Sequence, residues 1–125
     1  MAIFMNFFED SEVTTFFTEN ESLFQVGLIL KDESQSVHAH RHNVFPRNIV
    51  GTSEFLFVLQ GHMDITIFDE DFQNPEIFQV FKGCGVLLIG GAHAIEFREL
   101  TKLIEVKQGP YSVDDDKLYL SELDS

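Results

Sequence analysis

Short apolar runs separated by turn-forming residues limit this chain to a few kinds of fold. The runs are rich in Phe, Ile, Leu and Val, and no long segment repeats its apolar residues with the period of a helix. Closely spaced runs of this kind predict about eight short strands in an antiparallel sandwich or barrel. Beside residues 36–42, treated below, the strands are expected at 23–32, 54–60, 63–70, 76–82, 85–90, 93–97 and 102–107.

Length, cysteine content and charge narrow the class of protein. A chain of 125 residues fits one domain that can fold without disulfides, and its one cysteine, Cys84, allows no intramolecular bridge. The 21 acidic and 8 basic residues give a net charge of −13, so we expect no nucleic acid and no anionic membrane as partner. The first residues lack the cationic start of a signal peptide, which predicts a cytoplasmic protein.

The strand expected at 54–60 is apolar on both faces. Alternation puts Glu54 on one face with Leu56 and Val58, and the other face carries Phe55 and two further apolar residues. Both faces should therefore be covered, either by a second sheet or by another subunit. We expect a homodimer on this ground.

Three of the five histidines stand at alternate positions in the segment 36–42. On a strand, His38, His40 and His42 would share one face, where a pair of imidazoles can reach one metal ion. The alternative is polar decoration of an exposed strand. His93 shares its face with apolar neighbours and should point inward, either as a distant third ligand or as a buried histidine bonded to backbone.

These motifs together resemble the cupin superfamily. The HxH of that family matches "HRH" at 40–42 or "HAH" at 38–40, and "EFLFVLQG" matches its E-x6-G from Glu54 to Gly61. The segment "GCGVLLIGGAH", which ends in His93, is similar to the second cupin motif. The eleven residues between His42 and Glu54 make a longer gap than is usual in the family.

The resemblance covers roughly residues 24–107 and implies an all-β double-stranded β-helix, a jelly-roll β-barrel. The whole chain, 1–125, would then be a single cupin domain. Residues 1–23 would form an N-terminal strand extension, and 108–125 an acidic C-terminal segment at the surface.

A metal centre is what the resemblance implies for the site. His40, His42, Glu54 and His93 would hold a divalent Fe, Mn, Ni or Zn ion, with His38 as the alternative to His42. Three or four protein ligands with open positions are typical of catalytic centres, and His40 and His93 are the candidate catalytic histidines. For Glu54 the alternative is a carboxylate at a strand end without metal.

Arg47 lies between the histidines and Glu54 and is one of only eight basic residues. We expect it to act in catalysis by binding a carboxylate or phosphate at the cavity mouth, and a surface ion pair is the alternative.

The segment "IEVKQGPYSVDDDK" is similar to the cupin-type sugar-nucleotide ketoisomerases of polysaccharide pathways. The resemblance implies a metal-dependent enzyme, an isomerase or epimerase of a sugar or sugar nucleotide, or an oxygenase. Two alternatives stay open: a non-catalytic module that binds a small ligand, and a structural cupin with no metal.

Overall fold

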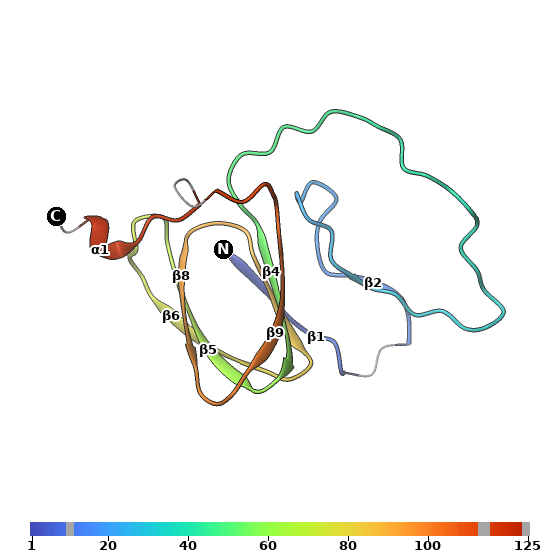
Figure 1. Ribbon diagram of the computed structural model, residues 1–125. Helices are drawn as coiled ribbons and strands as arrows, with labels where there is room; N and C mark the ends of the chain where they lie inside the picture. The colour runs from blue at the N-terminus through green and yellow to red at the C-terminus, as the bar shows by residue number, and fades with distance from the viewer. Residues whose placement is uncertain (10–11, 113–115, 124–125) are drawn as a thin grey trace.

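Figure 1 shows a computed structural model of the chain, which describes residues 1–9, 12–112 and 116–123. Strands are the main regular secondary structure of these residues and helix is almost absent, so the expected all-β class is confirmed. No helix in the described part is long and apolar enough to cross a membrane. The elements are β1 (Ala2–Asn6), β2 (Thr15–Phe16), β3 (Gly27–Leu28), β4 (Glu54–Gln60), β5 (His62–Phe68), β6 (Glu76–Phe81), β7 (Cys84–Leu88), β8 (Ala92–Phe97), β9 (Lys102–Lys107) and α1 (Leu120–Leu123).

Two antiparallel sheets form the body of the molecule. One has the strand order β1-β7-β4-β9 and the other the order β6-β5-β8, while β2 and β3 pair separately as a short ribbon. Among the described residues no ladder joins the two larger sheets, so they make a sandwich and not a closed barrel.

The hydrophobic core lies between these two sheets. Leu56 and Val58 of β4 face Met63 and Ile65 of β5, and all four are at most 2% exposed. This confirms the face that the alternation in 54–60 predicted for Leu56 and Val58, and Glu54 begins the same face. Burial of such side chains contributes about 1.5–3 kcal/mol each, which makes this layer the main stabilising element.

Aromatic side chains from the N-terminal part of the chain cover part of the outer face of β4. Phe7 lies with its ring centroid 6.1 Å from that of Phe55 and 5.5 Å from that of Phe57. On its other side Phe7 contacts Phe17 of the ribbon at 5.5 Å, edge to face. The expectation that both faces of 54–60 are covered is met in part: Phe55 and Phe57 are half-buried by the protein's own chain, and Leu59 on the same face stays 40% exposed.

The strand expected at 36–42 does not form. Residues 31–52 have no strand, and every one of them is exposed. The reason is that alternation only predicts which face each side chain would take. A segment becomes a strand only if its backbone also forms hydrogen bonds with a neighbouring strand. The run at 23–32 is likewise paired only at Gly27–Leu28. We call residues 31–49 the arm, and Figure 1 shows it as a wide loop between the ribbon and β4.

Both ends of the chain are attached to the body. β1 pairs with β7 from Ala2 to Asn6, so this part of the expected N-terminal extension is an edge strand of the larger sheet. The C-terminal segment is tied to β9 by an ion pair of 3.0 Å between Lys107 Nζ and Asp116 Oδ2. Residues 113–115 and 124–125 of the acidic segment lie outside the described residues.

Candidate functional site

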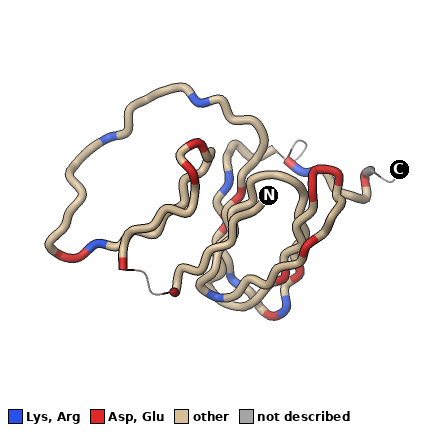
Figure 2. Tube along the Cα trace, turned by 180° about the vertical axis from the view of Figure 1, so that it is seen from behind, with Lys and Arg blue, Asp and Glu red and all other residues tan. Residues whose placement is uncertain are grey.

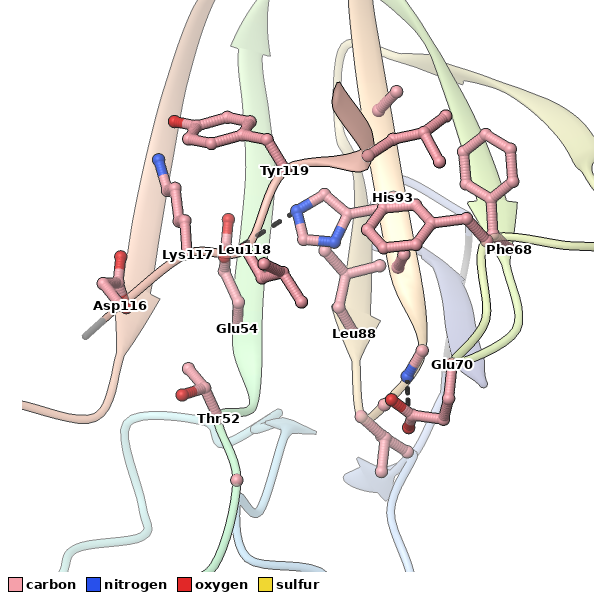
Figure 3. Close-up of a pocket in the computed structure, with 18 of the residues that line it drawn as sticks. Thr52, Glu54, Phe68, Glu70, Leu88, His93, Asp116, Lys117, Leu118 and Tyr119 are labelled. Atoms are coloured by element: carbon pink, nitrogen blue, oxygen red, sulfur yellow. Dashed lines mark hydrogen bonds and ion pairs between the residues drawn. The ribbon is translucent and has the colours of Figure 1, made fainter. Parts of the chain in front are cut away.

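A pocket of about 650 Å³ lies at one end of the sandwich (Figure 3). Its walls come from the first residues of β4 and β8, the ends of β5 and β7, and residues 116–120. A volume of this size suits a small organic molecule. The lining residues are Val50, Gly51, Thr52, Glu54, Phe68, Glu70, Phe72, Leu88, Ile89, Gly90, Gly91, Ala92, His93, Ala94, Asp116, Lys117, Leu118, Tyr119 and Leu120.

Glu54 and His93 reach the pocket from different sheets. Glu54 is the first residue of β4, on the face that buries Leu56, and His93 stands opposite Ile67 in the β5–β8 ladder. Nε2 of His93 lies 4.0 Å from Oε2 of Glu54, as the dashed line in Figure 3 marks. This is longer than a hydrogen bond, so an atom of a bound ligand can lie between the two groups.

The carboxyl of Glu54 holds its proton near neutral pH. Burial raises the pKa of Glu54 to about 7, and a hydrogen bond and charge repulsion from Glu105 act in the same direction. Lys107 and Lys117 oppose this rise in pKa without cancelling it. Glu105 is a diagonal neighbour of Glu54 on the same face, because the β4–β9 register pairs Glu54 with Lys107 and Leu56 with Glu105.

The imidazole of His93 is shifted the other way. Burial lowers the pKa of His93, and the positive charge of Lys117 lowers it further, while Glu105 partly opposes the shift. At neutral pH the pocket therefore holds a neutral imidazole beside a carboxyl that is partly protonated. Two such groups can each give or take a proton, which an ordinary ion pair of imidazolium and carboxylate cannot do as easily.

Residues near the C-terminus complete the wall next to this pair. Figure 3 shows Lys117 and Tyr119 beside Glu54 and His93. The ion pair of Asp116 with β9 holds this segment against the sheet. Across the pocket, the carboxylate of Glu70 accepts a hydrogen bond of 2.8 Å from the backbone N–H of Gly91.

Of the residues expected to form a site, the structure brings together Glu54 and His93 and leaves the others on the arm. His40 and His42 lie next to each other with ring centroids 5.4 Å apart, and Nδ1 of His40 is 2.8 Å from the carbonyl oxygen of His38. Arg47 stacks its guanidinium 3.8 Å above the ring of Phe45. These are contacts within the arm and do not involve the pocket.

The arrangement does not fit a bound metal as the resemblance implies it. Within residues 1–9, 12–112 and 116–123, no three His, Cys, Asp or Glu side chains are grouped so that they could hold an ion. Glu54 and His93 supply two donors, and His40 and His42, which the resemblance adds to them, lie on the arm.

Sequence reasoning missed Glu105, Lys117 and Tyr119 as parts of the site. Glu105 belongs to an expected strand, and its alternation with Lys107 could have indicated that it lies near Glu54 once the pairing of β4 with β9 was known. Lys117 and Tyr119 follow an acidic run and carry no pattern of their own. Only the path of the chain past the open end of the sandwich brings them to the pocket.

Comparison with protein-family models, with curated proteins and with solved structures finds no match to this chain. The chemistry of the pocket therefore has to be argued from its own side chains. The strongest indication from these side chains is that two titratable groups, Glu54 and His93, lie close together in a cavity of ligand size.

Proposed function

We propose that the pocket binds a small polyhydroxylated molecule, a sugar or sugar nucleotide, and that Glu54 and His93 isomerise or epimerise it by moving a proton. The observation that carries this proposal is the 4.0 Å contact between a neutral imidazole and a carboxyl with a pKa of about 7. General acid–base catalysis works best with groups whose pKa values are close to the working pH.

The proposed reaction uses each group once as base and once as acid. His93 Nε2 removes the proton from the carbon next to a carbonyl, and the electrons of that C–H bond form a C=C bond. The carbonyl oxygen takes up a proton from Glu54, which gives an enediol. Glu54 then accepts the proton of the other hydroxyl, and His93 returns its proton to the former carbonyl carbon. The bond changes balance without an oxidant or reductant.

The test is exchange of carbon-bound hydrogen in heavy water. The protein is incubated with a panel of aldoses, ketoses and sugar nucleotides, and deuterium at the carbon next to the carbonyl is followed by NMR. We expect exchange with one class of sugar, and its loss in Glu54→Gln and His93→Gln. Glu76→Gln changes an exposed carboxylate of β6 in the same way and should leave exchange intact.

Two results would contradict the proposal in different ways. Binding of a sugar without exchange would favour a non-catalytic binding module. Neither binding nor exchange would favour a structural role for the sandwich.

For the finer fold, we propose that the sandwich is a cupin jelly roll. Its support is the position of the two motifs. Glu54 begins β4 and His93 lies on β8, and both reach one cavity between the sheets, as paired cupin motifs would require. An experimental structure with a different strand connection would reject it.

A metal-dependent form of the enzyme is a second proposal. It needs the arm to move so that His40 and His42 reach Glu54 and His93, with Arg47 carried to the pocket mouth. Its support is that the arm rejoins the body at Thr52, two residues before Glu54 and itself part of the pocket lining.

Metal content tests this second proposal. Plasma mass spectrometry of untagged protein should find about one Fe, Mn, Ni or Zn ion per chain, lost in both His42→Ala and His93→Ala. Protein that holds no ion, or that keeps it in both variants, would reject the metal centre and leave the proton-transfer proposal standing.

A further inference from the structure

The arm is an exposed segment whose contacts are all local. Every hydrogen bond and ring contact that the structure gives for it joins residues at most three positions apart. Its apolar side chains face solvent; Val37 and Val44, for example, have exposed fractions of 74% and 102%. Apolar side chains held in solvent along one segment are typical of an interaction surface.

After Lys31, Asp32 and Glu33 at its start, the arm differs from the rest of the chain in charge. From Ser34 to Ser53 there is no Asp or Glu, and this stretch carries Arg41, Arg47 and three histidines. The whole chain has 21 acidic residues and 8 basic ones, so the rest of it is strongly acidic. Figure 2 shows blue and no red along the upper part of this loop, while the red positions lie at its start, on the ribbon and on the body.

The ribbon beside the arm has the opposite character. Residues 1–30 contain no Lys, Arg or His, and Glu19 and Glu21 lie exposed at the ribbon's end. Phe16 and Ile29 expose 59% and 57% of their surface.

The ribbon is also a very small sheet. β2 and β3 pair over only two residues each, and each has one ladder neighbour in the described structure. Two-stranded ribbons of this size are marginally stable by themselves, and a third strand would stabilise this one.

We propose that the arm of one copy of the chain docks along the edge of the ribbon of a second copy, and that the second arm does the same in return. The arm brings the cations that the ribbon lacks together with exposed apolar side chains. The ribbon offers carboxylates, exposed Phe16 and Ile29, and a strand edge that pairs with no further strand among the described residues. Addition of an extended segment to such an edge is a common mode of recognition.

A second copy is the occupant that the chain itself specifies. Because each copy carries both the basic arm and the acidic ribbon, a two-fold arrangement satisfies both pairs at once. A stable interface takes about 20–30 residues from each partner, and one arm with one ribbon supplies a set of this size. Figure 1 shows the arm as a wide loop that leads away from its own ribbon before it returns to β4.

Charge reversal tests this pairing. Arg41→Glu with Arg47→Glu makes the arm acidic, and Glu19→Lys with Glu21→Lys makes the ribbon basic. We expect the wild type to sediment as a dimer in analytical ultracentrifugation, and each double variant to dissociate at least about tenfold more readily. An equimolar mixture of the two variants should regain the dimer, because each arm then meets a ribbon of opposite charge.

The matched control reverses two cations outside the arm, Lys82→Glu with Lys102→Glu, and should stay dimeric. Far-ultraviolet circular dichroism checks that each variant is folded. A wild type that is monomeric at all concentrations would overturn the proposal. This result would also be seen if the arm docked on the ribbon of its own copy. A dimer that neither reversal weakens would also overturn it, because another surface would then hold the two copies.

Discussion

The pKa values of Glu54 and His93 stand in the reverse of their usual order: the carboxyl has the higher pKa and the imidazole the lower. An unperturbed carboxyl releases its proton well below an imidazole, but here the pKa of Glu54 is raised to about 7 and that of His93 is lowered from 6.5. Burial is the largest cause of both shifts, since it disfavours the charged form of either group. One environment therefore prepares an acid and a base for the same pH range.

The raised pKa of Glu54 should appear in the stability of the protein. A carboxyl whose folded-state pKa lies above its unfolded value of 4.5 contributes stability that is present below pH 4.5 and is lost as the pH rises through about 7. Between about pH 5 and pH 8, the wild type should lose on the order of 2 kcal/mol more than Glu54→Gln, at about 1.36 kcal/mol per pKa unit and discounted for solvent in the open pocket. Urea unfolding at both pH values measures this difference. Equal losses in the two proteins would contradict it.

Glu105 and Lys117 should have opposite effects on the pKa values of Glu54 and His93, and each should shift both pKa values in the same direction. Glu105 raises the pKa of Glu54 and of His93, so Glu105→Gln should lower both. Lys117 lowers both, so Lys117→Met should raise both. NMR titration of the side-chain carbon signals gives the two pKa values in each variant. Shifts in only one group would show that Glu54 and His93 do not share these neighbours.

At the scale of elements, pairing and not alternation decides which segments become strands. β4 and the segment 36–42 both alternate, but β4 lies between β7 and β9 and the segment lies alone on the arm. A central strand has both backbone edges bonded and both faces covered, whereas a lone extended segment exchanges its hydrogen bonds with water.

Two isoleucines on neighbouring strands differ in which face of the sheet they occupy. Ile65 of β5 is fully buried in the core, and Ile77 of β6 is 69% exposed. Ile65→Ala should lower the free energy of unfolding by about 2–5 kcal/mol, because it removes buried methyl groups and leaves a cavity. Ile77→Ala is the matched control and should change it by no more than about 0.5–1 kcal/mol. Urea unfolding measures both, and similar losses would mean that the core does not lie between the two sheets.

For the whole molecule, charge is divided along the chain. The first thirty residues contain no Lys, Arg or His, and the stretch from Ser34 to Ser53 contains no Asp or Glu. Within these stretches the ribbon and the arm project from the sandwich, while β1 belongs to it. The attraction between arm and ribbon is therefore local, and it acts against the repulsion between two copies that each carry a net charge of −13.

The arm should be the first part of the protein to be cut by trypsin. Arg41 and Arg47 lie in exposed chain without secondary structure, whereas Lys102 and Lys107 belong to β9. At low protein concentration we expect the first cuts after Arg41 and Arg47, identified by mass spectrometry. At a fixed trypsin concentration, a higher protein concentration should slow the fractional rate of these cuts by forming the dimer. First cuts in β9 would contradict the exposure of the arm, and a rate independent of concentration would contradict its docking.

The sequence by itself determined the β-class, the strands from residue 54 to 107 within one or two residues, and the inner face of β4. These follow from short-range alternation and turn residues, which act between neighbours in the chain. Glu54 and His93 could be singled out by the motifs that resemble the cupin superfamily and by their places on predicted strands, although His93 is exposed at the open pocket and not buried.

The tertiary structure alone decided which residues meet. The pairing of β4 with β9 brings Glu105 to Glu54, the return of the C-terminal segment adds Lys117, and the absence of a pairing partner leaves His40 and His42 in solvent. Such contacts join residues far apart in sequence, so they depend on how the sheets close around the core and leave no local pattern in the chain.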